Sequence, residues 1–307
     1  MLRKTWLRLT TLMTAVAFML CAVPSVYAQS ESSEEGFVYE VKNGEAIITE
    51  YTGNAQDLTI PATIDEYPVT QIGSYAFSGC ESILSVTIPA TIDYLSEGMF
   101  SGCSSLRSVS LPDTIESIDY VAFFGCESLE EINLPSTITT IEIGAFYGCS
   151  SLTEIALPAD LTLLQDWVFY SCTGLESIIL PQNLRGIGTE AFADCTSLQR
   201  ILIPSTTESI SDDAFTGCNQ LEIFGFDGSY TEAFAKEKNI PFSIFDGCGD
   251  VNIDWTVNIK DATSIQKHAA SIITLEEMPL AAADFNLDKR VNVKDATAIQ
   301  KSIAGIL

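Results

Sequence analysis

Hydrophobic residues recur in this chain at a fixed interval of 23 positions. Each interval contains a Cys, with a Phe three positions before it and an aliphatic residue three positions after it. Because no unit of this length can bury its own apolar face, the pattern predicts a solenoid whose stacked coils share one core. The recurring residues are Cys80, Cys103, Cys126, Cys149, Cys172, Cys195 and Cys218; Phe77, Phe100, Phe123, Phe146, Phe169, Phe192 and Phe215; and Ile83, Leu106, Leu129, Leu152, Leu175, Leu198 and Leu221.

Alternation of apolar and polar positions within one unit predicts a single short strand. Residues 129–134 place aliphatic side chains on one face, and Pro135 ends the strand because it has no N–H for a ladder hydrogen bond. Ile138 and Ile141 add a second inward pair, and residues 145–149 complete the core of the unit. Equivalent strands should form a parallel sheet along the array, about 4.8 Å apart.

The two ends of the array depart from the repeat. Residues 37–41 and 46–51, on either side of Lys42-Asn43-Gly44-Glu45, predict a hairpin that caps the first coil. Residues 230–238 predict a capping helix and residues 240–245 a closing strand. The first unit contains five extra residues near Tyr67-Pro68, which we expect to form a surface loop.

The seven evenly spaced cysteines suggest either disulfides or buried thiols. Equivalent cysteines of adjacent coils point the same way rather than at each other, which argues against pairing. Cys also packs well as a small buried hydrophobe. The single His of the chain, His268, lies outside the array, so a metal site there is disfavoured. We therefore expect a structural ladder of free thiols.

Two near-copies of one acidic segment close the chain, at 250–261 and 284–295. Side-chain oxygens fall at positions 1, 3, 5, 9 and 12 of each copy, the spacing at which a loop surrounds Ca²⁺ with oxygen ligands. Trp255 and Lys289 take position 6, where Gly normally permits the sharp turn, so we expect weaker calcium binding, above all in the first loop. The expected side-chain ligands are Asp250, Asn252, Asp254, Asn258 and Asp261 in the first copy and Asp284, Asn286, Asp288, Asn292 and Asp295 in the second.

Helical spacing after each acidic segment separates two faces. One face is an apolar stripe in each copy, and the two stripes are expected to pack together: Ala262, Ile265, Ala269 and Ile272 with Ala296, Ile299, Ile303 and Ile306. The other face carries matched lysines, which form either a solvated helix surface or a contact surface: Lys260, Ser264, Lys267 and Ser271 in the first copy and Lys294, Ala298, Lys301 and Gly305 in the second.

The 23-residue unit, Ser-Leu-x-x-Ile-x-Leu-Pro-x-x-Ile-x-x-Ile-x-x-x-Ala-Phe-x-Gly-Cys, resembles the BspA-type leucine-rich repeat of bacterial surface and secreted proteins. The resemblance covers about residues 58–226 and implies a curved solenoid used for adhesion or protein binding. It does not imply a reaction. Phe224 and Phe226 replace the aliphatic-Pro pattern in the last copy, which is therefore expected to end the array.

The tail, about residues 249–307, resembles a dockerin, through both Asp-x-Asn-x-Asp-x-x-Val-Asn-x-x-Asp loops and both Asp-Ala-Thr-x-Ile-Gln-Lys helix starts. A dockerin is a small all-α module that binds calcium and attaches its protein to a cohesin domain of a cellulosomal scaffoldin. The resemblance implies two calcium sites, with backbone carbonyls of Thr256 and Arg290 added to the ligands above. It makes the lysine faces the expected cohesin contacts, and since the faces are alike, either could engage a cohesin.

The N-terminus has the features of a secretory signal peptide: the basic residues Arg3, Lys4 and Arg8, followed by an apolar stretch at 12–23. Cys21 raises the alternative of lipid attachment, but its apolar neighbours favour simple cleavage after Ala28. The expected product is secreted and extracellular. The expected domains are a signal peptide at 1–28, a hairpin cap at 29–57, the solenoid at 58–228, a C-terminal cap at 229–248 and a dockerin at 249–307.

Charge excludes two classes of partner. The chain has 15 Lys and Arg against 41 Asp and Glu, a net charge of −26. Nucleic acid and anionic membranes need clustered cations, so neither is expected to bind. The acidic excess otherwise promotes solubility outside the cell.

Two outward columns of the solenoid are candidates for ligand binding. Phe124, Tyr147 and Tyr170 form an aromatic strip two positions before the Cys, which either receives a sugar ring or a protein edge, or covers its own neighbours. Seven positions after the Cys, the outward column becomes apolar at Ile179 and Leu202. This end is either a contact patch or is shielded by the C-terminal cap.

Three functions compete. The first is a non-catalytic binding or adhesion protein, attached by its dockerin to a cellulosome-type scaffold, whose solenoid contacts a protein, a cell surface or a polysaccharide. The second is a cellulosomal glycoside hydrolase or other polysaccharide-degrading enzyme. It is disfavoured because no stretch interrupts the repeat to build a cleft with two facing carboxylates. The third is a purely structural spacer.

Overall fold

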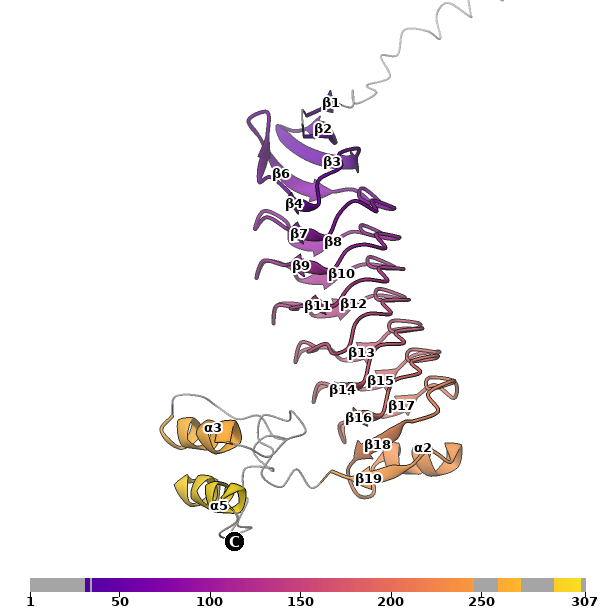
Figure 1. The fold of residues 1–307 in the computed structure, drawn as a ribbon, viewed down its shortest axis with the longest axis vertical. Coiled ribbons are helices and arrows are strands. Elements are labelled where there is room, and N and C mark those ends of the chain that lie inside the picture. Colours follow the sequence, from indigo (N-terminus) through magenta and orange to yellow (C-terminus); the bar gives the residue numbers. More distant parts are fainter. Residues whose placement is uncertain (1–30, 34, 246–258, 272–289, 305–307) are drawn as a thin grey trace, which may run out of the picture.

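The computed structural model describes residues 31–33, 35–245, 259–271 and 290–304 (Figure 1). Residues 35–245 form a rod of stacked coils with a cap at each end, so the predicted fold class is confirmed. The predicted signal peptide at 1–28 lies outside the described residues. Within the described part of the chain, no helix combines the length and the apolar content needed to cross a membrane.

A five-stranded sheet covers the N-terminal end of the rod, in the order β1-β2-β3-β6-β5. Its strands β2 and β3 form the predicted hairpin, with positive φ at Asn43 and Gly44, as a tight two-residue turn requires. The insertion near Tyr67-Pro68 is at the surface but is not the expected loop. It forms a second hairpin, because Asp65 and Glu66 also adopt positive φ and close the turn. The strands are β1 (Glu31–Ser32), β2 (Phe37–Lys42), β3 (Glu45–Tyr51), β5 (Thr63–Ile64) and β6 (Tyr67–Ile72).

The predicted strand of the repeat forms a parallel ladder along one side of the rod. Ser85, Ser108 and Glu131 are register partners, 23 positions apart, and the next residue of each strand is buried. The strands of this first ladder are β4 (Asp57–Thr59), β7 (Ser85–Thr87), β9 (Ser108–Ser110), β11 (Glu131–Ile132), β14 (Ser177–Ile179), β16 (Arg200–Leu202), β18 (Glu222–Gly225) and β19 (Phe242–Ile244).

A second ladder, which the sequence did not predict as strand, lies after the Pro of each coil. Its strands have two residues each, so they contain too little alternation to be recognised from a pattern. Of the predicted inward pair, Ile141 belongs to this ladder and Ile138 lies just before it; both are buried. Its strands are β8 (Tyr94–Leu95), β10 (Ser117–Ile118), β12 (Thr140–Ile141), β13 (Leu163–Leu164), β15 (Gly186–Ile187) and β17 (Ser209–Ile210).

Both ladders are interrupted at the same level of the rod. Residues 153–157, all described, form no strand, and β12 is not paired with β13, so each ladder divides into two sheets. The turns remain joined across this level: Phe146 N–H donates to Val168 O at 3.0 Å and Gly148 N–H donates to Tyr170 O at 2.8 Å. The turn side therefore holds the two halves of the array together.

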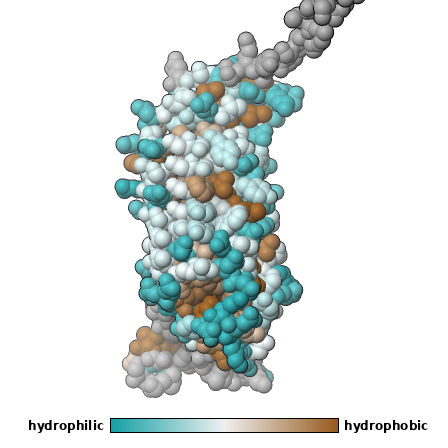
Figure 2. All heavy atoms as spheres, turned by 90° about the vertical axis from the view of Figure 1, so that its right-hand side faces the viewer, coloured by the Kyte–Doolittle hydropathy of each residue, from teal (hydrophilic) through white to brown (hydrophobic). Residues whose placement is uncertain are grey.

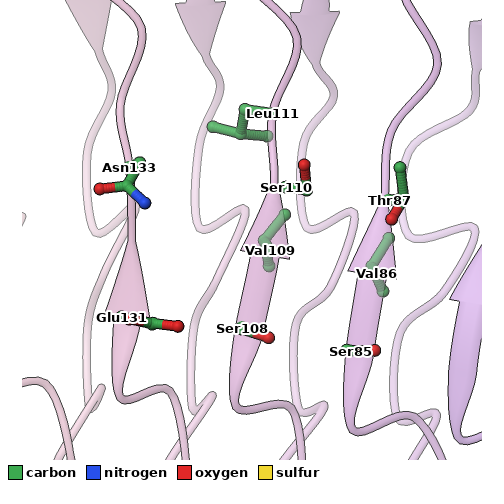
Figure 3. A pocket seen from close by; sticks show the side chains of 9 residues that line it. All are labelled: Ser85, Val86, Thr87, Ser108, Val109, Ser110, Leu111, Glu131 and Asn133. Atoms are coloured by element: carbon green, nitrogen blue, oxygen red, sulfur yellow. The ribbon is translucent and has the colours of Figure 1, made fainter.

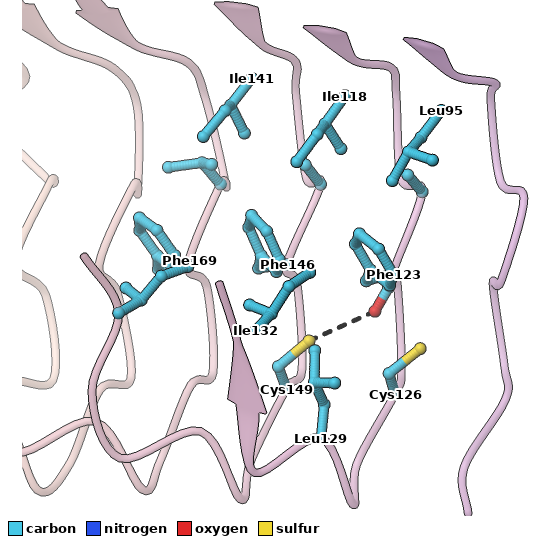
Figure 4. Packing of buried hydrophobic residues seen from close by; sticks show 14 of the residues in the cluster. Leu95, Ile118, Phe123, Cys126, Leu129, Ile132, Ile141, Phe146, Cys149 and Phe169 are labelled. Atoms are coloured by element: carbon cyan, nitrogen blue, oxygen red, sulfur yellow. Dashed lines mark hydrogen bonds between the residues drawn. The ribbon is translucent and has the colours of Figure 1, made fainter. Parts of the chain in front are cut away.

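The core of the rod is a column of stacked phenylalanines. Ring centroids of Phe123 and Phe146 lie 5.3 Å apart, those of Phe146 and Phe169 lie 5.6 Å apart, and the rings are nearly parallel. Figure 4 shows these rings beside the inward aliphatic residues of both ladders, such as Ile118 and Ile132. Each ring is buried only because the next coil covers its face, which is the property that the 23-residue period predicts.

The predicted thiol ladder is also present, since all seven cysteines of the array are free. Each thiol from Cys103 to Cys218 donates a hydrogen bond to the carbonyl of a Phe 26 positions earlier, in the preceding coil. Cys149 Sγ lies 3.3 Å from Phe123 O (Figure 4) and Cys172 Sγ lies 3.1 Å from Phe146 O. Each of these carbonyls also accepts the N–H of the Cys three positions later in its own coil, as Phe123 O does from Cys126 N–H at 3.1 Å. The thiol therefore adds a second, weak hydrogen bond between coils, which Ala or Val would lack.

The C-terminal end closes with a one-residue change in register. Arg200 pairs with Glu222 rather than with the residue 23 positions on, which places Phe224 beside Leu202. The predicted helix α2 (Tyr230–Lys238) then covers the core, with Ser229 as its N-cap and Asn239, in the left-handed region, as its C-cap. The predicted closing strand is present as β19.

The tail contains α3 (Ile259–Ala269) and α5 (Val293–Ile303). The helices pack together through the first residues of the predicted stripes, because Ala262, Ile265, Ala296 and Ile299 are all fully buried. The later stripe residues behave differently: Ala269 and Ile303 are exposed, and Ile272 and Ile306 lie outside the described residues.

The Phe column generates a first prediction. Phe146→Ala should lower the free energy of unfolding by about 3–5 kcal/mol, because it leaves a cavity between two rings. Phe124→Ala is the matched control, since this Phe is exposed, and it should cost less than about 1 kcal/mol. Urea unfolding of both variants tests the difference, and equal losses would contradict the proposed core.

The thiol ladder generates a second prediction. Burial raises the pKa of the Cys103 and Cys172 thiols from 9.0 to about 12 and raises the pKa of Cys126 and Cys149 well above its usual value. Between about pH 9 and 12 the unfolded chain therefore binds fewer protons than the folded chain, and stability falls as pH rises. Each such thiol should lower the free energy of unfolding by about 1.4 kcal/mol per pH unit in that window, and should have no effect below it.

Urea midpoints measured from about pH 7 to 10 check this pH dependence. Above pH 9, the midpoint of Cys149→Val should fall less steeply with pH than that of the unaltered chain, because one buried thiol is missing. A midpoint that stays constant through pH 10 would show that the thiols are not buried as described.

Candidate functional site

The two acidic segments of the tail each end in a fully buried carboxylate. Asp261 and Asp295 occupy the first turns of α3 and α5, and both are 0% exposed. Asp295 Oδ2 accepts a hydrogen bond from Asn292 N–H at 2.9 Å, and Asn292 Oδ1 accepts one from Lys294 N–H at 3.0 Å. The end of the second loop is thus folded back onto the start of its helix.

This arrangement fits a bound calcium ion. Position 12 of a calcium loop supplies a carboxylate at the start of the following helix, and Asp261 and Asp295 occupy this place in both copies. Within the second copy, Arg290, Asn292 and Asp295 are described. The other predicted ligands lie outside the described residues: Asp250, Asn252, Asp254, Thr256, Asn258, Asp284, Asn286 and Asp288, together with Trp255 and Lys289 of the sixth positions.

The predicted lysine faces are accessible. Lys260 and Lys267 of α3 are exposed, as are Lys294 and Lys301 of α5, and Ser264 and Ala298 are half-buried at matching places. Ser271 is exposed, and Gly305 lies outside the described residues. The two helices therefore present the same residue types in the same positions.

Sequence reasoning missed an apolar member of each face. Ile259 and Val293 directly precede Lys260 and Lys294, and each is 57% exposed. An aliphatic residue left in solvent at equivalent positions of both copies is typical of a contact surface. The sequence does contain a signal for these two residues, because an aliphatic residue occupies position 10 of both copies of the acidic segment.

The first ladder carries a shallow groove on its outer side, with a volume of about 380 Å³. Figure 3 shows two rows of outward side chains across three strands, one ending at Glu131 and the other at Asn133. Hydroxyls of Ser85, Ser108 and Ser110 fill most of these rows. Among the residues that line the groove, Glu131 is the one ionisable side chain, so the groove lacks the pair of carboxylates that glycoside hydrolysis needs.

The predicted aromatic strip lies on the turn wall, the name used here for the stacked turns 74–80, 97–103, 120–126, 143–149, 166–172, 189–195 and 212–218. Its three rings stack on one another: the centroids of Phe124 and Tyr147 lie 4.8 Å apart, and those of Tyr147 and Tyr170 lie 4.6 Å apart. The rings therefore cover their own neighbours, and Phe124, at 40% exposed, is the least covered.

The turn wall also holds aromatic residues that the strip did not include. Tyr120 and Trp167 are both exposed, and Trp167 Nε1 donates to Glu190 Oε2 of the next coil at 2.8 Å. Tyr170 makes a similar bond, because its hydroxyl donates to Asp194 Oδ2 at 3.1 Å, and this bond raises the pKa of the Tyr170 hydroxyl.

The apolar column of Ile179 and Leu202 does not form the open ligand patch that was one of its two predicted roles. Leu202 is 0% exposed, packed with Ile179, Phe224 and Phe226 of the ladder side and with Phe245 after β19. The one-residue shift of the last coil brings these Phe side chains over Leu202, so the cap shields it. Leu202 is therefore not a contact residue, while Ile179 remains half-buried at the edge of the cluster.

The hydropathy of the surface shows where apolar side chains remain exposed. On the face that Figure 2 shows, hydrophobic residues gather in one small group about midway along the rod and in another towards its C-terminal end. Hydrophilic or neutral residues cover most of the remainder.

Comparisons with known proteins identify both parts of the chain. The family described as BspA type leucine-rich repeat region, in six copies, matches residues 50–175 and 117–249, which together are more than half of the chain. The dockerin type I domain family matches residues 248–304. Dockerin type I domains bind calcium and dock onto cohesins, the pairing on which cellulosomes are assembled. Both predicted resemblances are confirmed.

Solved structures agree with the repeat assignment. A leucine-rich repeat protein of T. pallidum is 26% identical, with a TM-score of 0.58 over 69% of this chain and 98% of that chain. A leucine-rich repeat protein of Bacteroides ovatus is 30% identical, with a TM-score of 0.54 over 64% of this chain and 53% of that chain, so the match spans about half of that relative. No curated protein matches the chain. Leucine-rich repeat solenoids are typically binding proteins without catalytic activity, and this chain belongs to the BspA-type leucine-rich repeat proteins and ends in a dockerin type I domain.

Proposed function

We propose that this chain is a secreted, non-catalytic binding protein that a calcium-dependent dockerin attaches to a cohesin of a cellulosome-type scaffold. Its solenoid would carry the ligand-binding surface and its tail the attachment. The observation that carries the proposal is the pair of buried carboxylates, Asp261 and Asp295, each placed beneath an exposed face of matched composition.

Calcium would organise the tail in this proposal. Two loops, at 250–261 and 284–295, would each hold one ion, and each ion would fix the start of the following helix through Asp261 or Asp295. Binding of the ions would then be coupled to folding, because the ligands of each site converge only in the folded tail.

Cohesin recognition would use the matched faces. Lys260, Lys267 and Ile259 lie on α3 as Lys294, Lys301 and Val293 lie on α5, and all six are exposed. Since the two sets agree in charge, apolar content and accessibility, a cohesin could meet either one and bind in two orientations. Ser264 and Ala298, between the lysines, allow close approach of a partner backbone, and Ser271 extends the first face.

Removal of the buried carboxylates tests the calcium requirement. Asp261→Asn combined with Asp295→Asn should weaken calcium binding by at least about tenfold and reduce cohesin binding in parallel, because neutral ligands hold Ca²⁺ less tightly. Asp227→Asn, at an exposed position of the solenoid end, is the control and should change neither. Calorimetry of the full chain against a panel of cohesins, with calcium and with EDTA, gives the measurement. Undiminished binding in EDTA would overturn the proposal.

Alanine at the lysine pairs tests the two orientations. Lys260→Ala with Lys267→Ala should reduce cohesin affinity by about twofold, the loss of one of two equal modes, and Lys294→Ala with Lys301→Ala should do the same. The combination of all four changes should abolish most of the affinity. If one pair alone abolished binding, the faces would not be equivalent.

A further inference from the structure

The turn wall carries acidic residues, five of which lie in its last three turns. Its seven turns contain six carboxylates and no Lys, Arg or His. Lys238 of α2 pairs with one of the six, Asp212, at the C-terminal end. The remaining carboxylates therefore leave a negative potential along this side, concentrated around the coils that carry Asp166, Glu190 and Asp194.

The centre of the same wall is aromatic. Tyr120, Phe124, Tyr147, Trp167 and Tyr170 come from three successive turns. Because the rings of Phe124, Tyr147 and Tyr170 stack on one another, the middle of the strip offers edges rather than open faces. The open surfaces are the outer face of Phe124, at the N-terminal end of the stack, and the indole of Trp167, two coils further along in the turn of Tyr170; they are 40% and 41% exposed.

Trp167 is placed at a cost to stability. Its φ is +57°, in the left-handed region. The equivalent positions of other turns hold Gly98 and Gly144, and also the non-Gly residues Tyr75, Val121 and Glu190, all at positive φ. A non-Gly residue there costs about 1–2 kcal/mol, and an exposed side chain recovers little of it through burial. Since other turns accept non-Gly residues here too, it is the exposed indole of Trp167 and its neighbours, rather than the strain, that indicate recognition.

The indole lies beside the aromatic strip. A Cβ built on Gly144, at the equivalent position one coil earlier, would be 3.9 Å from the Cβ of Tyr147, so the column of Trp167 adjoins the column of the rings. The hydrogen bond to Glu190 fixes the indole and holds a carboxylate next to it. Tyr170 and Asp194 repeat the same combination of ring and carboxylate.

We infer that the turn wall between Tyr120 and Asp194 binds an arginine-rich segment of a partner protein. A guanidinium stacks on an aromatic face and donates two parallel hydrogen bonds to a carboxylate, and this wall supplies both groups side by side. The inference rests on the proposed function of the solenoid as a binding surface and names the partner of that surface.

The dimensions suit a short extended peptide. Phe centroids from Phe123 to Phe192 span roughly 16 Å, in steps of 5.3, 5.6 and 5.5 Å. An extended chain covers that distance with about five residues. A polysaccharide fits less well, because sugar rings need open aromatic faces and the strip covers most of its own.

A labelled hexa-arginine peptide tests the inference on the full chain by fluorescence anisotropy. Hexa-lysine should bind at least about fivefold more weakly, because an ammonium lacks the planar fork, and hexa-citrulline should not bind. Trp167→Gly should weaken hexa-arginine binding by at least about fivefold, through the lost stacking. The same variant should keep or increase the urea midpoint, since Gly suits the left-handed position, so loss of binding would not reflect unfolding.

Charge-matched variants separate a site from general attraction by an acidic protein. Glu190→Gln with Asp194→Asn should weaken binding strongly, while Glu130→Gln with Glu154→Gln, exposed outside the turn wall, removes the same charge and should change affinity less than about twofold. Equal effects of the two pairs would show general attraction and overturn the inference. So would equal binding of hexa-lysine, or Trp167-dependent binding of cellohexaose in place of the peptide.

Cohesin binding of the Trp167→Gly variant keeps this test independent of the attachment. It should equal that of the unaltered chain. Loss of cohesin binding by the unaltered chain would refute the attachment and leave peptide binding intact, and failure of peptide binding alone would refute the arginine-rich partner.

Discussion

No coil of this solenoid closes its own core. Phe146 is buried because Phe123 and Phe169 cover its two faces, and the carbonyl of Phe146 accepts a thiol hydrogen bond from Cys172 of the next coil. Apolar burial therefore depends on neighbouring coils, and hydrogen bonds between coils add to those within each turn. The consequence is that the array needs a cover at each end, which the N-terminal sheet and α2 provide. Tyr51 packs on Phe77 at one end, and Phe234 packs on Phe215 at the other.

Because the inside is fixed by stacking, the outside is free to vary. The first ladder presents hydroxyls at Ser85 and Ser108 but apolar side chains in its last coils, where Phe224 and Phe226 cover Leu202. The turn wall varies separately, from Ser101 to the rings of Phe124 and Tyr147. The solenoid therefore carries several chemically different surfaces, and the dockerin tail adds another that lies outside the repeat.

The period of 23 was sufficient to predict the fold, because it constrains many columns at once. It could not predict β8, whose two residues are too short for a pattern, nor the register shift of β18, which depends on one missing residue in the last coil. Both ladders also break near residues 153–157, where the repeat itself continues. For the site, spacing singled out Asp261 and Asp295, which the structure shows to be buried. The left-handed position of Trp167 had a weak signal, because Gly98 and Gly144 occupy the same column, but Tyr75 and Val121 in that column obscured it.

The thiol-to-carbonyl bond has an implication for the history of the chain. Each bond joins a Cys to a Phe of the coil before it with nearly the same geometry, as between Cys126 and Phe100 and between Cys195 and Phe169. Any coil can therefore be followed by a copy of any other with this hydrogen bond between coils preserved. Gene duplication or loss in whole units would lengthen or shorten the rod while both caps still fit, so the length of the rod can change without redesign of the interior.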